Sequence, residues 1–208
     1  MPDDGTIIPI SDEQAKLGQE IIKAFSGVAA FIEKALGSAP EDLIGYLGGD
    51  WLRFRRAENI AKMMKLSKEK LEARGVKDQK PASLTITLPI LRGAADESRE
   101  TLQDLWARLL AATIDPSRVD GVRQGFASAI SKMDPPDALL LGYFKTINIG
   151  VITIDARDQT VRALGISLDE LTISFDNLDK LGLVVINKTI QTVYITPFGR
   201  EFLRVVSD

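Results

Sequence analysis

Leu178-Asp179-Lys180-Leu181-Gly182-Leu183-Val184 and, shortly after it, Tyr194-Ile195-Thr196-Pro197-Phe198-Gly199-Arg200-Glu201-Phe202 are the two runs that define the C-terminal architecture. Gly182 is a typical end of a helix. The β-branched residues in 183–186 and 192–195 predict two strands around a polar turn. Thr196-Pro197 predicts a new helix, because threonine caps helices and proline suits the first helical position.

Four further elements are expected between residue 134 and this hairpin. Ser167 and Glu170 form a capping box, which predicts the start of a helix. The expected elements are a helix over 138–147, a strand over 151–154, a helical turn over 161–164 and a helix that follows Ser167 and ends at Gly182. This order of helix, strand, two helices and hairpin resembles a winged helix.

Asp134-Pro135-Pro136 is the best candidate for a domain boundary, because prolines and the residues before them leave helical structure. We therefore expect a helical region over 1–133 and a winged-helix-like α+β domain over 134–208. The expected helices of the first region cover 11–37, 38–47, 50–74, 86–95 (with Pro89 in its first turn), 97–113 and 119–133, and Leu52 is expected on the buried side of the third. The fold class is mainly α.

The composition excludes several kinds of active site. The 208 residues carry a net charge of −3 and include no cysteine and no histidine. Nucleophile pairs that need histidine are impossible, and so are zinc sites built from cysteine and histidine. No phosphate-binding loop is present. We therefore expect no enzyme activity, no catalytic residue, no metal, no cofactor and no small-molecule substrate.

The N-terminal sequence favours a cytoplasmic protein. No basic region followed by an apolar core follows Met1, so no secretory signal is predicted. The apolar stretch over 24–32 is too short to span a bilayer. The segment 21–36 carries Lys23 and Lys34 against Glu20 and Glu33, whereas membrane-surface helices have a basic polar face. We expect it to form a core or subunit contact.

A basic helix is the first candidate for a binding surface. Ten Lys and Arg residues stand against four Asp and Glu residues between Arg53 and Lys80. Such a helix could bind phosphates, which makes binding salt-dependent. The alternative is a solvated face that acidic residues elsewhere in the fold neutralise. The candidate binding residues are Arg53, Arg55, Arg56, Lys62 and Lys65.

The charges of the helix before the hairpin disfavour binding to DNA. A winged helix normally inserts this helix into the major groove. Here it carries Asp169, Glu170, Asp176 and Asp179 against Lys180. Carboxylates facing a polyanion repel it, so this helix favours a protein contact or a structural role.

The run Thr101-Leu102-Gln103-Asp104-Leu105-Trp106-Ala107-Arg108-Leu109-Leu110-Ala111 carries a family resemblance, together with Gly49-Asp50-Trp51-Leu52-Arg53, Asp115-Pro116 and Met133-Asp134-Pro135-Pro136-Asp137-Ala138. These pieces, over about 45–140, resemble the bacterial abortive-infection alpha (Abi-alpha) family. The resemblance implies defence against bacteriophage and supplies no catalytic residues. Trp106, Leu109 and Leu110 lie at helical spacing within the run, so we expect them in the core.

The resulting hypothesis is a non-enzymatic phage-defence protein that acts through protein–protein contacts and self-association. The alternatives are a winged-helix regulator that binds nucleic acid, which the charges disfavour, and an effector that acts on membranes, which the N-terminal segment disfavours.

Overall fold

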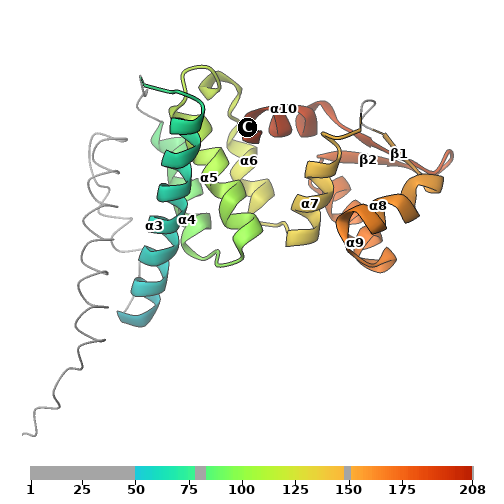
Figure 1. Cartoon of the computed structure of the whole chain (residues 1–208), viewed down its shortest axis with the longest axis horizontal. Coiled ribbons are helices and arrows are strands. Elements are labelled where there is room, and N and C mark those ends of the chain that lie inside the picture. The colour runs from blue at the N-terminus through green and yellow to red at the C-terminus, as the bar shows by residue number, and fades with distance from the viewer. Residues whose placement is uncertain (1–49, 78–82, 148–150, 208) are drawn as a thin grey trace, which may run out of the picture.

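The computed structural model describes residues 50–77, 83–147 and 151–207. Helices dominate this part of the chain, and a three-stranded antiparallel sheet lies in its C-terminal half (Figure 1). The predicted fold class, mainly α with a small α+β region at the C-terminus, is confirmed. The helices expected over 11–37 and 38–47 lie outside the described residues.

The N-terminal half of the described chain is a bundle built around one central helix. Ten of the fifteen residues of this helix, α5, are buried, and it packs against α3, α4 and α6. A helix can be buried on most sides only if apolar residues occupy most of its positions. The elements of this half are α3 (Asp50–Ala73), α4 (Leu84–Ala95), α5 (Glu100–Ile114), the 3₁₀ helix η1 (Val119–Gly121) and α6 (Gln124–Ile130).

Two of the expected helices differ from the prediction. Pro89 lies inside α4 and not in its first turn, because the helix already begins at Leu84, after Ser83. The helix expected over 119–133 is divided, since Val122 and Arg123 adopt extended backbone between η1 and α6. Val122 and Phe126 are both buried, as the pattern predicted.

The predicted burial of Leu52 is also wrong, because its side chain is 51% exposed. Among the described side chains of α3, the buried stripe runs through Ala57, Ile60, Met63 and Leu71. The spacing of apolar residues predicted the buried side of α3, but it did not show that Leu52 lies outside the core.

The C-terminal half has the predicted order of elements. Its strands pair antiparallel in the order β1-β3-β2, with Tyr194 of β3 opposite Val151 of β1 and Val185 of β2. The elements are α7 (Pro135–Tyr143), β1 (Val151–Thr153), η2 (Ile154–Ala156), α8 (Arg157–Leu164), α9 (Leu168–Lys180), β2 (Val184–Asn187), β3 (Thr192–Ile195) and α10 (Pro197–Val206).

Both predicted caps of this half are present. Ser167 Oγ accepts a hydrogen bond from the Glu170 N–H at 3.1 Å, and the Glu170 carboxylate accepts one from the Ser167 N–H at 2.7 Å. Thr196 Oγ1 accepts from the Gly199 N–H at 2.9 Å and donates to the Gly182 carbonyl at 2.6 Å. Thr196 therefore fixes the start of α10 against the end of α9.

Gly199 allows α10 to approach the chain between α9 and β2. A Cβ atom at this position would lie 2.0 Å from the Leu183 carbonyl oxygen, which is far inside contact distance. The backbone oxygen cannot move aside as a flexible side chain would. Glycine is therefore required here by close packing, while its own φ is ordinary.

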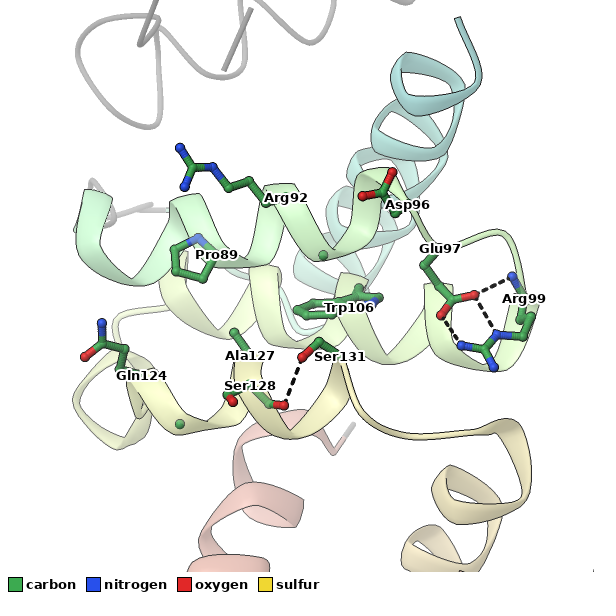
Figure 2. Close-up of a pocket in the computed structure, with 12 residues that line it drawn as sticks. Pro89, Arg92, Asp96, Glu97, Arg99, Trp106, Gln124, Ala127, Ser128 and Ser131 are labelled. Carbon is green, nitrogen blue, oxygen red and sulfur yellow. Dashed lines mark hydrogen bonds and ion pairs between the residues drawn. The ribbon is translucent and has the colours of Figure 1, made fainter. Parts of the chain in front are cut away.

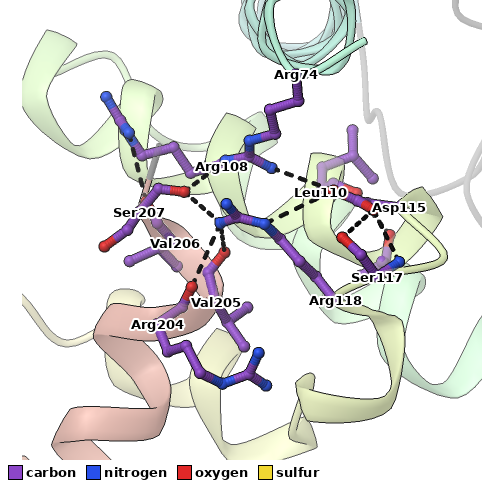
Figure 3. A network of polar contacts seen from close by, with 11 residues as sticks. Arg74, Arg108, Leu110, Asp115, Ser117, Arg118, Arg204, Val205, Val206 and Ser207 are labelled. Carbon is purple, nitrogen blue, oxygen red and sulfur yellow. Dashed lines mark hydrogen bonds and ion pairs between the residues drawn. The ribbon is translucent and has the colours of Figure 1, made fainter. Parts of the chain in front are cut away.

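Three arginines fasten the last turn of α10 to the N-terminal bundle (Figure 3). The last carbonyls of a helix lack partners within it and carry partial negative charge. Arg74, directly after α3, donates to the Ser207 carbonyl at 2.7 Å, and Arg118 donates to the Val205 carbonyl at 3.1 Å and also to that of Ser207. The third, Arg108 of α5, donates to the Val206 carbonyl at 3.4 Å.

An aromatic contact strengthens this junction. The ring of Phe126 in α6 packs against Phe198 and Phe202 of α10, with ring centroids 5.1 Å and 5.2 Å apart. Buried residues form one cluster that extends across residue 134. The division of the chain into domains at this residue stays a prediction.

Replacing Gly199 by alanine tests the close approach. Gly199→Ala should lower the free energy of unfolding by about 1–3 kcal/mol, as overpacking does. Gly142→Ala in α7 is the matched control, because a Cβ there meets no atom within 4 Å. It should stabilise by about 0.5–1 kcal/mol through helix propensity. Urea unfolding of both variants measures this, and equal effects would contradict the packing.

Candidate functional site

The basic helix α3 is largely neutralised by carboxylates of the same fold. Within Asp50–Ala73 seven basic residues stand against four acidic ones, an excess of three. Three of its basic side chains reach carboxylates that lie after α4 or on α5. These ion pairs are Arg56–Asp96 at 2.6 Å, Lys62–Glu100 at 3.5 Å and Lys70–Asp104 at 2.5 Å.

The other candidate residues on α3 do not converge on one point. Arg55 pairs with Glu58 of its own helix at 3.1 Å. Lys65 is exposed and has no ion-pair partner among the described residues. Arg53 belongs to α3, but its side chain lies outside what the structure describes. Arg56 and Lys62 are engaged as above, so Lys65 is the one candidate without an ion pair among the four whose side chains the structure describes.

Trp106, Leu109 and Leu110 are buried in the bundle, and Trp106 is only 1% exposed. The indole ring lies directly against α4 at Gly93. A Cβ atom on Gly93 would lie 2.4 Å from two carbon atoms of that ring. Gly93 therefore makes room for Trp106. Sequence reasoning identified the tryptophan but missed the glycine that receives it.

A cleft of about 770 Å³ opens where α4 and α6 flank Trp106 (Figure 2). Pro89, Arg92 and Gly93 line it from α4, while Gln124, Ser128 and Ser131 line it from α6. No residue of this cleft except Trp106 was among the predicted site residues. Its lining combines short neutral side chains with the charged Arg92, Asp96, Glu97 and Arg99, and no sequence motif marks this set.

One end of the cleft is closed by Glu97 and Arg99. The guanidinium of Arg99 binds the Glu97 carboxylate at 2.8 Å and the Asp134 carboxylate at 2.6 Å. Burial raises the pKa of Glu97, but the hydrogen bonds and charge of Arg99 lower it further, so this pKa lies below its ordinary value. The ion pairs join the α4–α5 connection to the start of α7.

Asp104 of α5 occupies a similar environment. Burial raises its pKa, while Arg108 and Lys70 lower it by hydrogen bonds and by charge, and the pKa is lower than in a free aspartate. Arg108 Nε lies 2.5 Å from one Asp104 oxygen, and Lys70 Nζ lies 2.5 Å from the other. Asp104 thus links α3 and α5 by charge.

A second surface lies on α9, where Ile173 is 65% exposed. Glu170 and Asp176 stand three residues before and after it, on the same side of the helix. A cleft of about 490 Å³ between α7 and α9 is lined by Ile173, Glu170, Asp176 and Pro136. Asp169 and Asp179 are exposed as well, and Asp179 accepts a hydrogen bond from the Ile186 N–H at 3.1 Å.

Neither a metal-binding cluster nor a membrane-spanning helix occurs among the described residues. No group of three or more His, Cys, Asp or Glu side chains there is placed to hold a metal ion. No helix in that part of the chain combines the length and the apolar character needed to cross a membrane.

A double-mutant cycle tests the Gly93–Trp106 contact. Gly93→Ala should lower the free energy of unfolding by about 1–3 kcal/mol, although alanine is the better helix former. In a Trp106→Phe background, whose smaller ring leaves room for the added methyl group, the same change should cost less. Chemical unfolding of all four proteins checks this. A stabilising Gly93→Ala in the parent chain would contradict the contact.

The lowered pKa values of Glu97 and Asp104 predict acid sensitivity. Each carboxyl binds its proton more weakly in the folded chain, so its stabilising contribution is complete above the unfolded pKa and is lost as the pH falls through the folded pKa. The free energy of unfolding should therefore decline below the ordinary glutamate value of 4.5. Glu97→Gln should make this decline shallower in urea unfolding measured over a pH series. An unchanged slope would contradict the assignment.

Comparisons with known proteins bear on the whole of this architecture. No curated protein and no solved structure matches the chain, so its winged-helix assignment stays a prediction. A family model described as abortive infection alpha matches residues 55–206, which run from the second turn of α3 to the end of α10. The chain belongs to the abortive infection alpha family.

Proposed function

We propose that this chain is a non-enzymatic phage-defence protein that acts through protein–protein contacts. Membership of the abortive infection alpha family associates it with abortive infection, the defence of bacteria against phage. The sequence has neither histidine nor cysteine, the residues most used as general base and strong nucleophile. Binding is therefore the chemistry that this sequence favours.

The exposed face of α9 is the observation that carries this proposal. In the position where a winged helix would read DNA, it displays Ile173 between Glu170 and Asp176. A polyanion would meet repulsion at this face. A protein partner would instead cover the isoleucine and supply basic groups opposite the carboxylates.

The balance of charge on α3 supports the same conclusion. Phosphate binding needs cations that are free to replace counterions. Arg56, Lys62 and Lys70 are instead held by carboxylates of the bundle. These ion pairs leave fewer cations on α3 for phosphates than its sequence suggests, which supports a protein partner over nucleic acid.

Reversing charge on α9 distinguishes a protein partner from DNA. The double variant Asp169→Lys, Asp176→Lys should lose protection in a plaque assay on bacteria that express the chain, because the basic partner is then repelled. The matched control is Asp155→Lys, Asp158→Lys. Asp158 and Asp169 both occupy the second position of a helix and are exposed, so both changes cost the same helix-dipole interaction.

The expected result is that phage plate at least about tenfold more efficiently on cells with the α9 variant than on cells with the control, a difference of about 1.4 kcal/mol if it reflects partner affinity. DNA binding in a gel shift should remain absent from the parent chain. If the α9 variant protects fully and also binds DNA more tightly, as added lysines favour in a nucleic-acid reader, the proposal fails.

A further inference from the structure

Strand β2 forms an edge of the three-stranded sheet. Among the strands that the structure describes, it has a neighbour, β3, on one side only. Successive residues of an antiparallel strand direct their N–H and C=O groups alternately to its two sides. The Leu183 carbonyl accepts from the Thr196 N–H at 3.0 Å, so the odd-numbered residues turn their backbone groups toward β3. Val184 and Ile186 therefore direct theirs toward the open side.

An edge of this kind is a template on which another strand can pair. The outer face of the sheet adds an apolar row, because Tyr194 lies directly opposite both Val151 of β1 and Val185 of β2. Val185, at the end of this row, is 49% exposed. A strand added beside β2 would extend the row and cover this side chain, so an unguarded edge would favour association.

The carboxylate of Asp179 closes the open side. Its Oδ1 atom accepts a hydrogen bond from the Ile186 N–H at 3.1 Å, in exposed surroundings. The turn at Gly182 makes this contact possible, because its φ of 72° suits glycine and brings the chain back beside the end of α9. An outward N–H that a new strand would need is thus already occupied by the chain itself.

Asp179 stands at an unfavourable place for an aspartate within α9. The helix ends at Lys180, and the C-terminal end of a helix carries partial negative charge, which disfavours a carboxylate. Aspartate is also a weaker helix former than alanine. The contact with Ile186 offsets these costs. The position of Asp179 is therefore explained by the strand edge and not by the helix.

A second copy of the same edge fits the open side of β2 by symmetry. In a two-fold antiparallel pairing centred on Val185, Val184 of one copy stands opposite Ile186 of the other, and the outward N–H and C=O groups of both residues bond to each other. Val185 then faces its own counterpart and joins the two apolar rows. This pairing needs the Ile186 N–H of each copy, which is the group that Asp179 occupies.

We propose that Asp179 is an autoinhibitory cap that keeps β2 from pairing with the β2 strand of a second copy of this chain. The cap goes beyond the protein contact proposed for α9, since it concerns an association that the chain prevents. Removal of the acceptor oxygen opens the edge, whereas removal of the charge alone leaves it closed.

Asp179→Ala tests the cap, because it removes the acceptor and favours the helix. Light scattering of the full chain, over a dilution series that reaches about 1 mM, detects weak association. The mass of Asp179→Ala should rise with concentration toward about twice that of the parent, as a two-fold contact predicts. Asp179→Asn is the matched control. It removes the same charge but keeps an oxygen that can accept from Ile186, so its mass should follow the parent's.

Val185→Lys identifies the surface that associates. The two-fold pairing places residue 185 opposite itself, and like charges directly opposite each other destabilise strand pairing. Val185 is half-exposed, so a lysine there can reach solvent. The double variant Asp179→Ala, Val185→Lys should therefore return to the mass of the parent at every concentration.

Amide hydrogen exchange at Ile186, measured by NMR, reports on the cap directly. At low concentration this amide should exchange about tenfold faster in Asp179→Ala than in the parent, as loss of a hydrogen bond to a charged group predicts. It should become slow again as association proceeds.

Equal masses of Asp179→Ala and the parent throughout the series would overturn the proposal. Association that persists in the double variant, or that appears equally in Asp179→Asn, would also overturn it. The proposed function does not depend on these results, because the plaque assay of the α9 variant measures protection and not self-association.

Discussion

Burial of α5 on nearly every side is the constraint from which the rest of the fold follows. Helices α3, α4 and α6 surround it within the bundle, and α7 and α10 reach it from the C-terminal half. Two of its polar side chains bind neighbouring elements: the Gln103 amide donates to the Ala94 carbonyl at 3.1 Å, although its Oε1 has no partner among the described residues, and Asp104 binds Lys70 and Arg108. The run around Trp106 that carries the family resemblance is thus primarily a folding motif.

The return of α10 makes the two halves of the described chain depend on each other. Its rings pack on Phe126, and its last carbonyls accept hydrogen bonds from Arg74 after α3, Arg108 of α5 and Arg118 before η1. Asp115, which is 3% exposed, lies 3.6 Å from Arg118 and 3.9 Å from Arg74 and so balances part of their charge. Loosening α10 would therefore disturb the bundle that forms the α4–α6 cleft.

The sequence predicted helix starts correctly where they depend on residues close by in the chain, as at Ser167 and Thr196. The Ser167 and Thr196 caps are contacts over three residues, and both were legible without any tertiary information. The start of α4 and the break at Val122 could not be predicted in this way. Proline usually stands in the first turn of a helix, whereas Pro89 lies inside α4, and the apolar helical pattern around Val122 gave no sign of a break. Gly93 and Gly199 gave no signal at all, since their importance lies in what approaches them.

Charge shows most clearly why a site cannot be read from a helix alone. Along the sequence α3 is a basic segment, but Asp96, forty residues from Arg56, neutralises part of it once the chain folds. The acidic residues of α9 are also partly balanced, since Lys132 and Lys180 line the same cleft as Glu170 and Asp176. Folding therefore changes the charge that each helix presents from what its own segment of sequence suggests, because residues of other elements lie against it.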